Sequence, residues 1–335
     1  MTGFNEAYLI DTETKDRILS SDISASGIIR PYVRGQDLNR WQADWHSLWM
    51  IAMASSDDAP WPWARETSEE SAESIFKQTH PSLYLHFKSH EKNLRARYPE
   101  NQGKFWWEVR TCQYWDKFNH PKIFYQDITW RLNFCLDTRS TLANSTIYFL
   151  PTSDPWLLAV LNSAASWWYA FRTAQHGKDE ALRYFTTFVR SFPIPACEPS
   201  QQGIISSTLS RLAEIASARQ DAGSDLLDWL KVEFGITEPN TKLQNPIGLD
   251  SDQFVGEVKK VRGKSKELTG AQVKRLRDEY AVSIEPARVL KTEADGLELQ
   301  IHDLVNDAYG LTPDEVRLMW DTAPPRMPIE RPTGI

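Results

Sequence analysis

The sequence predicts an α+β protein, in which a mixed α/β part with antiparallel strands precedes a helical part. Runs rich in aromatic and β-branched residues, typical of strands, occupy residues 122–151. Apolar residues at helical spacing fill almost all of the chain beyond Pro199. The two prolines of the segment 193–195 prevent regular structure and indicate a boundary. A chain of 335 residues is long enough to form two hydrophobic cores. With the boundary at these prolines, the predicted domains are 1–198 and 199–335.

The first domain is expected to begin with a turn, a strand and a helix. Pro31 rules out a simple helix around it, and the Gly-Gln-Asp sequence at 35–37 predicts a turn that caps a short helical piece. The short apolar run 47–53 predicts a buried strand. Residues 69–98 have the apolar spacing of a helix, with a break at Pro81.

Strands dominate the middle of the first domain, where they are expected to form an antiparallel meander. A Gly-Lys-Asp-Glu loop at 177–180 separates the two helices that follow. The predicted elements are strands at 122–128, 132–137 and 145–151, and helices at 155–172 and 181–191.

The second domain is predicted from apolar stripes and from helix-end signals. Gly235 and Gly310 each follow a stripe, as expected of helix C-caps. Thr269 and Thr312 each precede a Gln or Glu by three residues, which is the capping-box pattern of a helix N-terminus. The stripes lie at 205–216, 226–234 and 297–308.

The net charge of −7 is typical of a cytoplasmic protein, but it is unevenly distributed. Residues 84–198 carry 14 basic and 10 acidic side chains, a net charge of +4, while 1–83 and 199–335 have net charges of −6 and −5. Of the 14 tryptophans, 12 lie between Trp41 and Trp168. Nucleic-acid binding is therefore expected in the basic, aromatic-rich middle, with weak and strongly salt-sensitive binding by the chain alone.

Composition and motifs exclude several other classes. No apolar run approaches the length of a membrane span, and no signal peptide is seen. Three cysteines without a C-x-x-C pair indicate a reducing cytoplasm and no thiolate zinc site. The chain has no G-x-G turn, no P-loop and no Asn/Asp-Pro-Pro-aromatic motif, so it is not expected to bind S-adenosylmethionine or hydrolyse nucleotides. His80, His86 and His90 have helical spacing, but Pro81 breaks the register, so no metal site is expected.

Residues 104–131 contain the side chains that DNA recognition requires. Arg, Gln and carboxylates can read base edges, Lys and Arg can bind phosphates, and exposed aromatic rings can stack on bases. A packed aromatic core under an ordinary charged surface would explain the same composition, so composition alone leaves both interpretations open. The candidates are Lys104, Trp106, Trp107, Arg110, Gln113, Lys117, Lys122, Tyr125, Gln126, Asp127 and Arg131.

Several segments, taken in order, resemble one known family. GFNEAYLID (3–11), IIRPYVRGQDLNRW (28–41), the basic segment 80–110 ending in FWWEVR, and RYFTTFVRSFPIP (183–195) are similar to its successive motifs. LVNDAYGLTPDEVRLMW (304–320) resembles the C-terminus of its methylases. The family is the TaqI-like C-terminal specificity domain, or target-recognition domain, of adenine-specific DNA methyltransferases and type IIG restriction–modification enzymes. Related methylases of phage-exclusion systems share it.

The resemblance implies a specificity subunit or fragment that recognises double-stranded DNA in the cytoplasm and is not catalytic alone. No cofactor is expected in this chain. S-adenosylmethionine would be held by a methyltransferase subunit, or by a methylase half that would precede residue 1. The chain would bind DNA phosphates through the surface formed by residues 84–131 and would hold the target adenine for that partner.

The resemblance also divides the candidate residues by role. Gly35, Asp37, Arg40 and Trp41 are expected to shape the domain, and Trp106 with Trp107 to form a packing platform beside the DNA. If Arg110 or Arg131 reads guanine, its loss should relax one position of the recognised site. The full set expected at the DNA is Lys104, Trp106, Trp107, Arg110, Lys117, Tyr125, Gln126, Arg131, Lys178 and Arg183.

Two alternatives remain open at this level. A magnesium-dependent DNA endonuclease could use Asp252, Glu257 and Lys259, although these residues adjoin a basic run at 256–266 that is typical of a solvated helix face. A decayed fragment could act only through contacts with other proteins.

Overall fold

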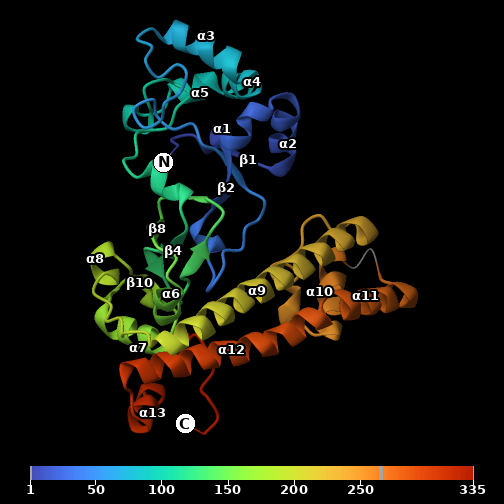
Figure 1. Ribbon diagram of the computed structural model, residues 1–335. Coiled ribbons are helices and arrows are strands. Elements are labelled where there is room, and N and C mark those ends of the chain that lie inside the picture. The colour runs from blue at the N-terminus through green and yellow to red at the C-terminus, as the bar shows by residue number, and fades with distance from the viewer. Residues whose placement is uncertain (1, 264–266, 335) are drawn as a thin grey trace. The chain divides into compact units, whose positions relative to one another are not determined.

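The protein is described by a computed structural model that covers residues 2–263 and 267–334 (Figure 1). The end of the predicted basic run, residues 264–266, lies outside the described residues. The chain forms two compact units. Unit 1 contains the residues up to Asp154 together with Ala174–Ser191, and unit 2 contains Pro155–Thr173 and the residues from Phe192 onward. Unit 1 is mixed α and β and unit 2 is helical, so the predicted α+β class is confirmed.

Short helices surround the sheets of unit 1. Side chains cap several of them: Asp11 accepts a hydrogen bond from the Thr14 backbone at the start of α2, and Ser68 accepts one from Ser71 at the start of α3. The helices are α1 (Asn5–Tyr8), α2 (Thr12–Ser21), α3 (Glu69–Thr79), α4 (Pro81–Ser89), α5 (Glu91–Arg95) and α8 (Thr186–Val189), with 3-10 helices η1 (Ile23–Gly27), η2 (Gly35–Asp37), η3 (Pro99–Asn101), η4 (Trp115–Asn119) and η5 (Lys178–Glu180).

Three small sheets form the rest of unit 1. The first has the order β1-β3-β2-β7, with β7 parallel to β2, and the other two, β6-β4-β8 and β5-β10-β9, are antiparallel throughout. The strands are β1 (Leu9–Ile10), β2 (Ile29–Val33), β3 (Trp49–Ile51), β4 (Lys122–Gln126), β5 (Ile128–Thr129), β6 (Cys135–Asp137), β7 (Leu142–Ala143), β8 (Ile147–Leu150), β9 (Gln175–His176) and β10 (Leu182–Arg183).

Two predictions about this part are wrong. The three strands at 122–151 are not a meander, because β4 lies between β6 and β8 instead of at one edge. Of the helix predicted over 181–191, only the short helix α8 is present, and residues 182–183 instead form strand β10. Leu182 is fully buried and pairs with Thr129 on β5, and this long-range pairing overrides the local helical pattern.

Unit 2 is built on two long helices. Figure 1 shows α9 and α12 running side by side in opposite directions, and contacts between them are extensive. The 36 residues of α9 make a helix about 54 Å long. The predicted capping boxes at Thr269 and Thr312 and the left-handed caps Gly235 and Gly310 are all present. The helices are α6 (Pro155–Leu161), α7 (Ala164–Thr173), α9 (Pro199–Phe234), α10 (Ser251–Arg262), α11 (Gly270–Ser283), α12 (Glu285–Tyr309) and α13 (Pro313–Asp321), with the 3-10 helix η6 (Pro246–Gly248).

Helices α6 and α7 belong to unit 2, although they interrupt unit 1 in the sequence. The first packs on α9 and the second on α12, where the Ala164 backbone donates a hydrogen bond of 2.9 Å to His302 Nδ1. The compact units therefore differ from the ranges 1–198 and 199–335. That these ranges act as a recognition domain and a helical domain stays a prediction.

Candidate nucleic-acid interface

The aromatic residues expected beside the DNA are mostly core. Trp106, Trp107 and Tyr125 are each at most 2% exposed. The Trp107 ring stacks on Phe105 at 5.1 Å and on Phe76 at 5.2 Å between centroids. Other rings stack on Trp107, and the cations of Lys88 and Arg95 lie over the Trp106 ring, so packing is favoured over base stacking for both tryptophans.

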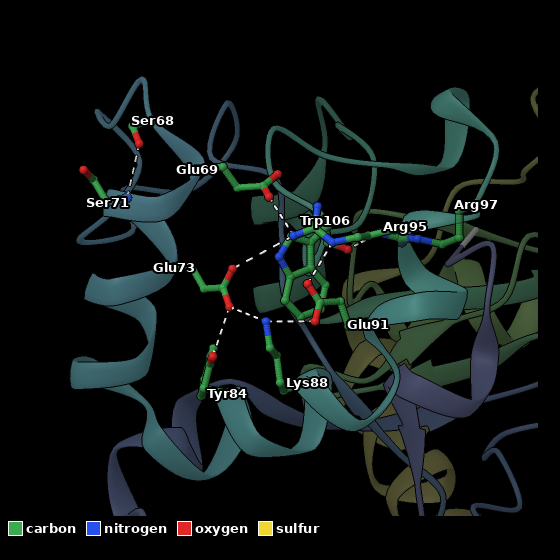
Figure 2. Close-up of polar contacts among 10 residues, drawn as sticks. All are labelled: Ser68, Glu69, Ser71, Glu73, Tyr84, Lys88, Glu91, Arg95, Arg97 and Trp106. Atoms are coloured by element: carbon green, nitrogen blue, oxygen red, sulfur yellow. Dashed lines mark hydrogen bonds and ion pairs between the residues drawn. The ribbon is translucent and has the colours of Figure 1, made fainter.

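The basic helices α4 and α5 form an ion-pair network with the acidic helix α3. Figure 2 shows Lys88 between Glu73 and Glu91, with Nζ–Oε distances of 2.7 and 2.8 Å. Arg95 contacts Glu69 at 2.7 Å and lies over the Trp106 ring at 5.2 Å from its centroid. The positive charges of this segment are thus balanced by carboxylates within unit 1, which weakens their attraction for DNA phosphates.

The network should make the stability of unit 1 depend on pH. Burial disfavours the charged form of Glu73, but hydrogen bonds from Lys88 and Tyr84 outweigh burial and lower the pKa of Glu73. Hydrogen bonding from Lys88 likewise lowers the pKa of Glu91, and hydrogen bonding to Glu73 raises the pKa of Lys88. Lowered carboxyl pKa values stabilise the fold above pH 4.5, and this contribution is lost as the pH falls below that value.

We expect the melting temperature to fall below about pH 4.5, and the substitution Lys88→Met to weaken that fall. Because the pairs are partly exposed, the substitution should cost only about 0.2–1 kcal/mol at pH 7. Thermal melts followed by circular dichroism from pH 3 to 8 would measure this. Lys92→Met, on the exposed side of α5, is the matched control and should leave the acid limb of the profile unchanged. Equal profiles for both variants would contradict the role of the network.

Three of the predicted cations lie on the surface outside the small sheets. Lys104 is exposed and donates a hydrogen bond of 2.7 Å to the Ala64 carbonyl. Arg110 is exposed on the segment that leads to η4, and Lys117 is exposed within η4. Neither residue belongs to strand β4 or strand β10, which carry the predicted residues Gln126 and Arg183.

The predicted motif at 35–41 meets the end of strand β4. A Cβ atom on Gly35 would lie 2.8 Å from Gln126 Nε2 and 2.9 Å from Thr146 Oγ1, so a larger residue here would displace these two side chains. The Gln126 side chain accepts a hydrogen bond from Asn133. Close packing thus fixes Gln126, one of the predicted DNA-binding residues, against the motif.

The other motif residues hold this loop in shape. Asp37 is buried and accepts hydrogen bonds from the Arg34 backbone and guanidinium. Trp41 is buried with a left-handed φ of 74°, and its backbone bonds to Phe134 and Leu136. The side chain of Arg40 is half-buried beside the Trp41 ring. These contacts favour the structural role expected for the motif.

A hydrogen bond at the surface connects the 35–41 motif, through Asn39, to Arg131, which follows strand β5. The Arg131 guanidinium donates a hydrogen bond of 2.7 Å to Asn39 Oδ1, and Arg131 is exposed. The Asn39 amide also donates a hydrogen bond to Asp44, so both ends of the amide are engaged and it serves to hold the exposed guanidinium of Arg131, which is a group suited to base edges.

The sheet β5-β10-β9 presents a row of side chains to solvent. Arg183 is directly opposite Ile128 on one side and Gln175 on the other, so the three side chains share one face. On the opposite face, Thr129 and Leu182 are fully buried. The row Gln175, Arg183 and Ile128 is hereafter the ribbon face.

The loop between β9 and β10 is a tight turn with two left-handed residues. Asp179 and Glu180 have φ of 55° and 61°, and the Ala181 N–H bonds to the Lys178 carbonyl at 3.2 Å. These features are those of a type I′ hairpin turn. The indole of Trp130 donates a hydrogen bond of 3.1 Å to the Asp179 carbonyl and braces the turn. Lys178, another predicted residue, is exposed at its edge.

The prediction from sequence missed three residues of this region. Trp130 is 44% exposed, and Gln175 and Asn39 contribute amide groups. Residues 181–191 were expected to be helical, which hid the pairing of Arg183 with Gln175. The turn at 177–180 lies between residues 175–176 and 182–183, which can both form short strands, and this pattern could have revealed the hairpin.

The alternative nuclease site is not assembled. Asp252 and Glu257 are five positions apart on α10, about 140° around the helix axis. Asp252 is exposed and pairs with Arg277 at 2.7 Å, whereas Glu257 is nearly buried and accepts hydrogen bonds from Lys260 at 2.7 Å and Asn240 at 3.0 Å. Lys259 is exposed. The expectation that these residues form one metal site is therefore wrong.

Histidines also do not form a metal site. Burial lowers the pKa of His80 and His86, and their rings contact Ser24 Oγ and the Ala7 carbonyl, each at 2.9 Å. Among residues 2–263 and 267–334, no group of three or more His, Cys, Asp or Glu side chains is placed to hold a metal ion. None of the helices in the same residues combines the length and hydropathy of a membrane span.

Comparisons with known proteins place two families on the chain. Residues 30–194 match the TaqI-like C-terminal specificity domain, and residues 198–305 match a domain of unknown function, DUF8810. No curated protein matches the chain. Among solved structures, the type IIL restriction–modification enzyme MmeI in complex with DNA is similar, with a TM-score of 0.46 and 11% identity. The match covers 95% of this chain and 34% of MmeI, so the chain spans about a third of that enzyme.

The family match includes the motif loop at Gly35, the β4 end at Gln126, the Trp130–Asp179 brace and the ribbon face. It covers the resembling segment 80–110 and most of 28–41 and 183–195, whereas the segments 3–11 and 304–320 lie outside it. Residues 30–194, just under half of this chain, are therefore similar to the TaqI-like C-terminal specificity domain.

Proposed function

We propose that this protein recognises a specific sequence in double-stranded DNA within a restriction–modification system. The observation that carries the proposal is the location of the ribbon face and the Arg131–Asn39 pair inside a specificity-domain match. Guanidinium and amide groups on a rigid backbone are the groups that distinguish base pairs in the major groove. The protein would act in the cytoplasm, where it meets the DNA.

The catalytic step would belong to a methyltransferase partner, either a separate subunit or another part of the same protein. The chain has neither a G-x-G turn for S-adenosylmethionine nor an Asn/Asp-Pro-Pro-aromatic motif for the target amine. The partner would therefore supply the cofactor and transfer its methyl group to adenine. The chain would select the site and hold the duplex, as befits phage defence by a type IIG or related enzyme.

We expect the chain alone to bind DNA with modest affinity but to prefer its target sequence clearly over other sequences. Lys88 and Arg95 are already paired with carboxylates, so few cations remain for phosphates. Phosphate contacts supply most of the affinity and all of its steep salt dependence, whereas base contacts supply specificity. The partner would then contribute much of the affinity for DNA.

Reconstituted methylation tests this proposal. The full chain is mixed in turn with each adenine methyltransferase of the same organism, S-adenosylmethionine and unmethylated genomic DNA, and methyladenine is mapped by single-molecule sequencing. We expect methylation confined to one recurring sequence when the chain is present, and little or none in its absence. The same methylated sites with and without the chain would contradict the proposal.

A further inference from the structure

We propose that the hairpin β9–β10 enters the major groove as a two-stranded ribbon and that Arg183 and Gln175 read neighbouring base pairs. This inference rests on the proposed function and names the side chains that carry its specificity. The sequence predicted Arg183 at the DNA only as one of ten residues, on a helix, and did not predict Gln175.

The register of the hairpin places the two side chains together. Arg183 is directly opposite Gln175, and Leu182 is directly opposite His176. Opposed residues of antiparallel strands have Cβ atoms about 4.5–5.5 Å apart on one face. Because successive base pairs are about 3.4 Å apart, two such side chains can reach neighbouring pairs without rearrangement of the backbone.

The chemistry of the pair suits base edges. A guanidinium can donate two hydrogen bonds to O6 and N7 of guanine, and a glutamine amide can pair with N6 and N7 of adenine. Ile128, the third member of the ribbon face, is 36% exposed and offers an apolar contact for a thymine methyl group. The major groove, about 12 Å wide, admits a two-stranded ribbon, which here would be the hairpin β9–β10, while β5 is the third strand of the same sheet and flanks β10.

Arg183 is oriented by its neighbours but keeps its hydrogen-bonding capacity. Its guanidinium lies 3.7 Å from Asp127 Oδ2, longer than a hydrogen bond, and 4.8 Å from the centroid of the Phe185 ring. The side chain is 32% exposed. A ring and a distant carboxylate thus limit its rotation without accepting a hydrogen bond from it, which lowers the entropy cost of binding. Because Nε is buried, the terminal nitrogens of the guanidinium would contact the base.

The turn at the end of the hairpin holds the ribbon rigid. Two consecutive non-glycine residues in the left-handed region are costly and persist only where the surroundings fix them. Trp130 provides that restraint through its bond to the Asp179 carbonyl, and the Gly177 N–H bonds to the Ala181 carbonyl at 2.7 Å. Strain of this kind gathers at binding sites, where a fixed shape is required.

The test is selection of binding sequences from a random duplex library, with the full chain and its variants compared in the same buffer. We expect Arg183→Ala to lose about 10–100-fold of the preference for guanine at one position, and Gln175→Ala to relax an adjacent position. Arg183→Lys should keep overall affinity but lose the same preference, because a single ammonium cannot replace the fork of donors.

Two controls separate base reading from charge and from folding. Arg190→Ala removes an exposed cation of unit 1 outside the ribbon face, and it should weaken binding to all sequences alike. The double substitution Asp179→Asn with Glu180→Gly introduces Asn-Gly, a preferred pair of a type I′ turn, and removes two negative charges. It should select the same sequence with increased affinity.

The outcomes distinguish this inference from the proposed function. If the wild-type chain selects a sequence and Arg183→Ala, Arg183→Lys and Gln175→Ala all select it with unchanged discrimination, the ribbon does not read bases, although the proposed function stands. If the wild-type chain enriches no sequence at any salt concentration, both are overturned. Circular dichroism melts of each variant identify any that do not fold.

Discussion

Replacing Glu108 with alanine is expected to lower the free energy of unfolding of unit 1 by about 3–5 kcal/mol. The residue is fully buried, and its carboxylate accepts hydrogen bonds from Trp63 Nε1 at 2.9 Å, Ser56 N at 3.0 Å and Phe105 N at 3.2 Å. Each buried donor left without an acceptor costs about 1–3 kcal/mol. The effect is large because one carboxylate accepts hydrogen bonds from two segments, the connection between β3 and α3 and the residues just before Glu108.

Urea unfolding followed by tryptophan fluorescence would measure this loss, since Trp63 is one of the donors. Glu100→Ala is a suitable control, because Glu100 is an exposed acidic residue of the nearby 3-10 helix η3. It should change the stability by less than about 0.5 kcal/mol. A loss below about 1 kcal/mol for Glu108→Ala would contradict the central place assigned to this carboxylate.

The second large effect is expected for Lys122→Met. The Lys122 side chain is 0% exposed, and its ammonium contacts Asp137 Oδ2 at 2.6 Å and donates a hydrogen bond of 3.0 Å to the Phe118 carbonyl. Burial lowers the pKa of Lys122, and the neighbouring Asp137 charge opposes that shift. Removing the cation leaves Asp137 buried without its partner, at a cost of about 3–5 kcal/mol.

A double-mutant cycle with Asp137→Leu isolates the pair. Because an apolar pair can replace a buried ion pair at little cost, the double variant should be more stable than Lys122→Met alone. Lys117→Met, at an exposed position of η4, is the matched control and should have little effect. Additive losses in the double variant would show that the two charges do not stabilise each other.

Much of the helical part could be predicted because its signals are local. Capping boxes and glycine caps act within one turn, so Thr269, Thr312, Gly235 and Gly310 marked helix ends correctly. The stripes at 205–216 and 226–234 proved to be one helix, α9, because no residue between them stops it. Gly223 lies inside it, near the Pro246 ring.

The sheets were harder to predict because their pairing is between distant segments. Leu182 and Arg183 form a strand only because β5 and β9 lie on either side of them. Similarly, the order β6-β4-β8 depends on tertiary packing that no short window contains. Elements of two residues are below the length at which hydrophobic periodicity can be read.

The candidate interface was predicted in part, since residue types can be read from the sequence but burial and pairing cannot. Trp106 and Trp107 suit base stacking as residue types, yet the fold covers both with other side chains. Lys88 and Arg95 contribute to the positive charge of the middle segment, but α3 supplies carboxylates that pair with them. Arg131, Lys178 and Arg183 remain at or near the surface, beside residues that the sequence did not single out.

The ratio of the chain's affinities for its target sequence and for an unrelated sequence tests most directly whether this chain recognises a DNA sequence. Equilibrium binding is measured for a duplex with the selected sequence and for a shuffled duplex of the same composition, at one fixed salt concentration. We predict at least about 100-fold tighter binding to the selected sequence, the combined effect of two base readers. Binding should weaken for both duplexes as salt is added. Equal affinity for the two duplexes would contradict sequence recognition by this chain.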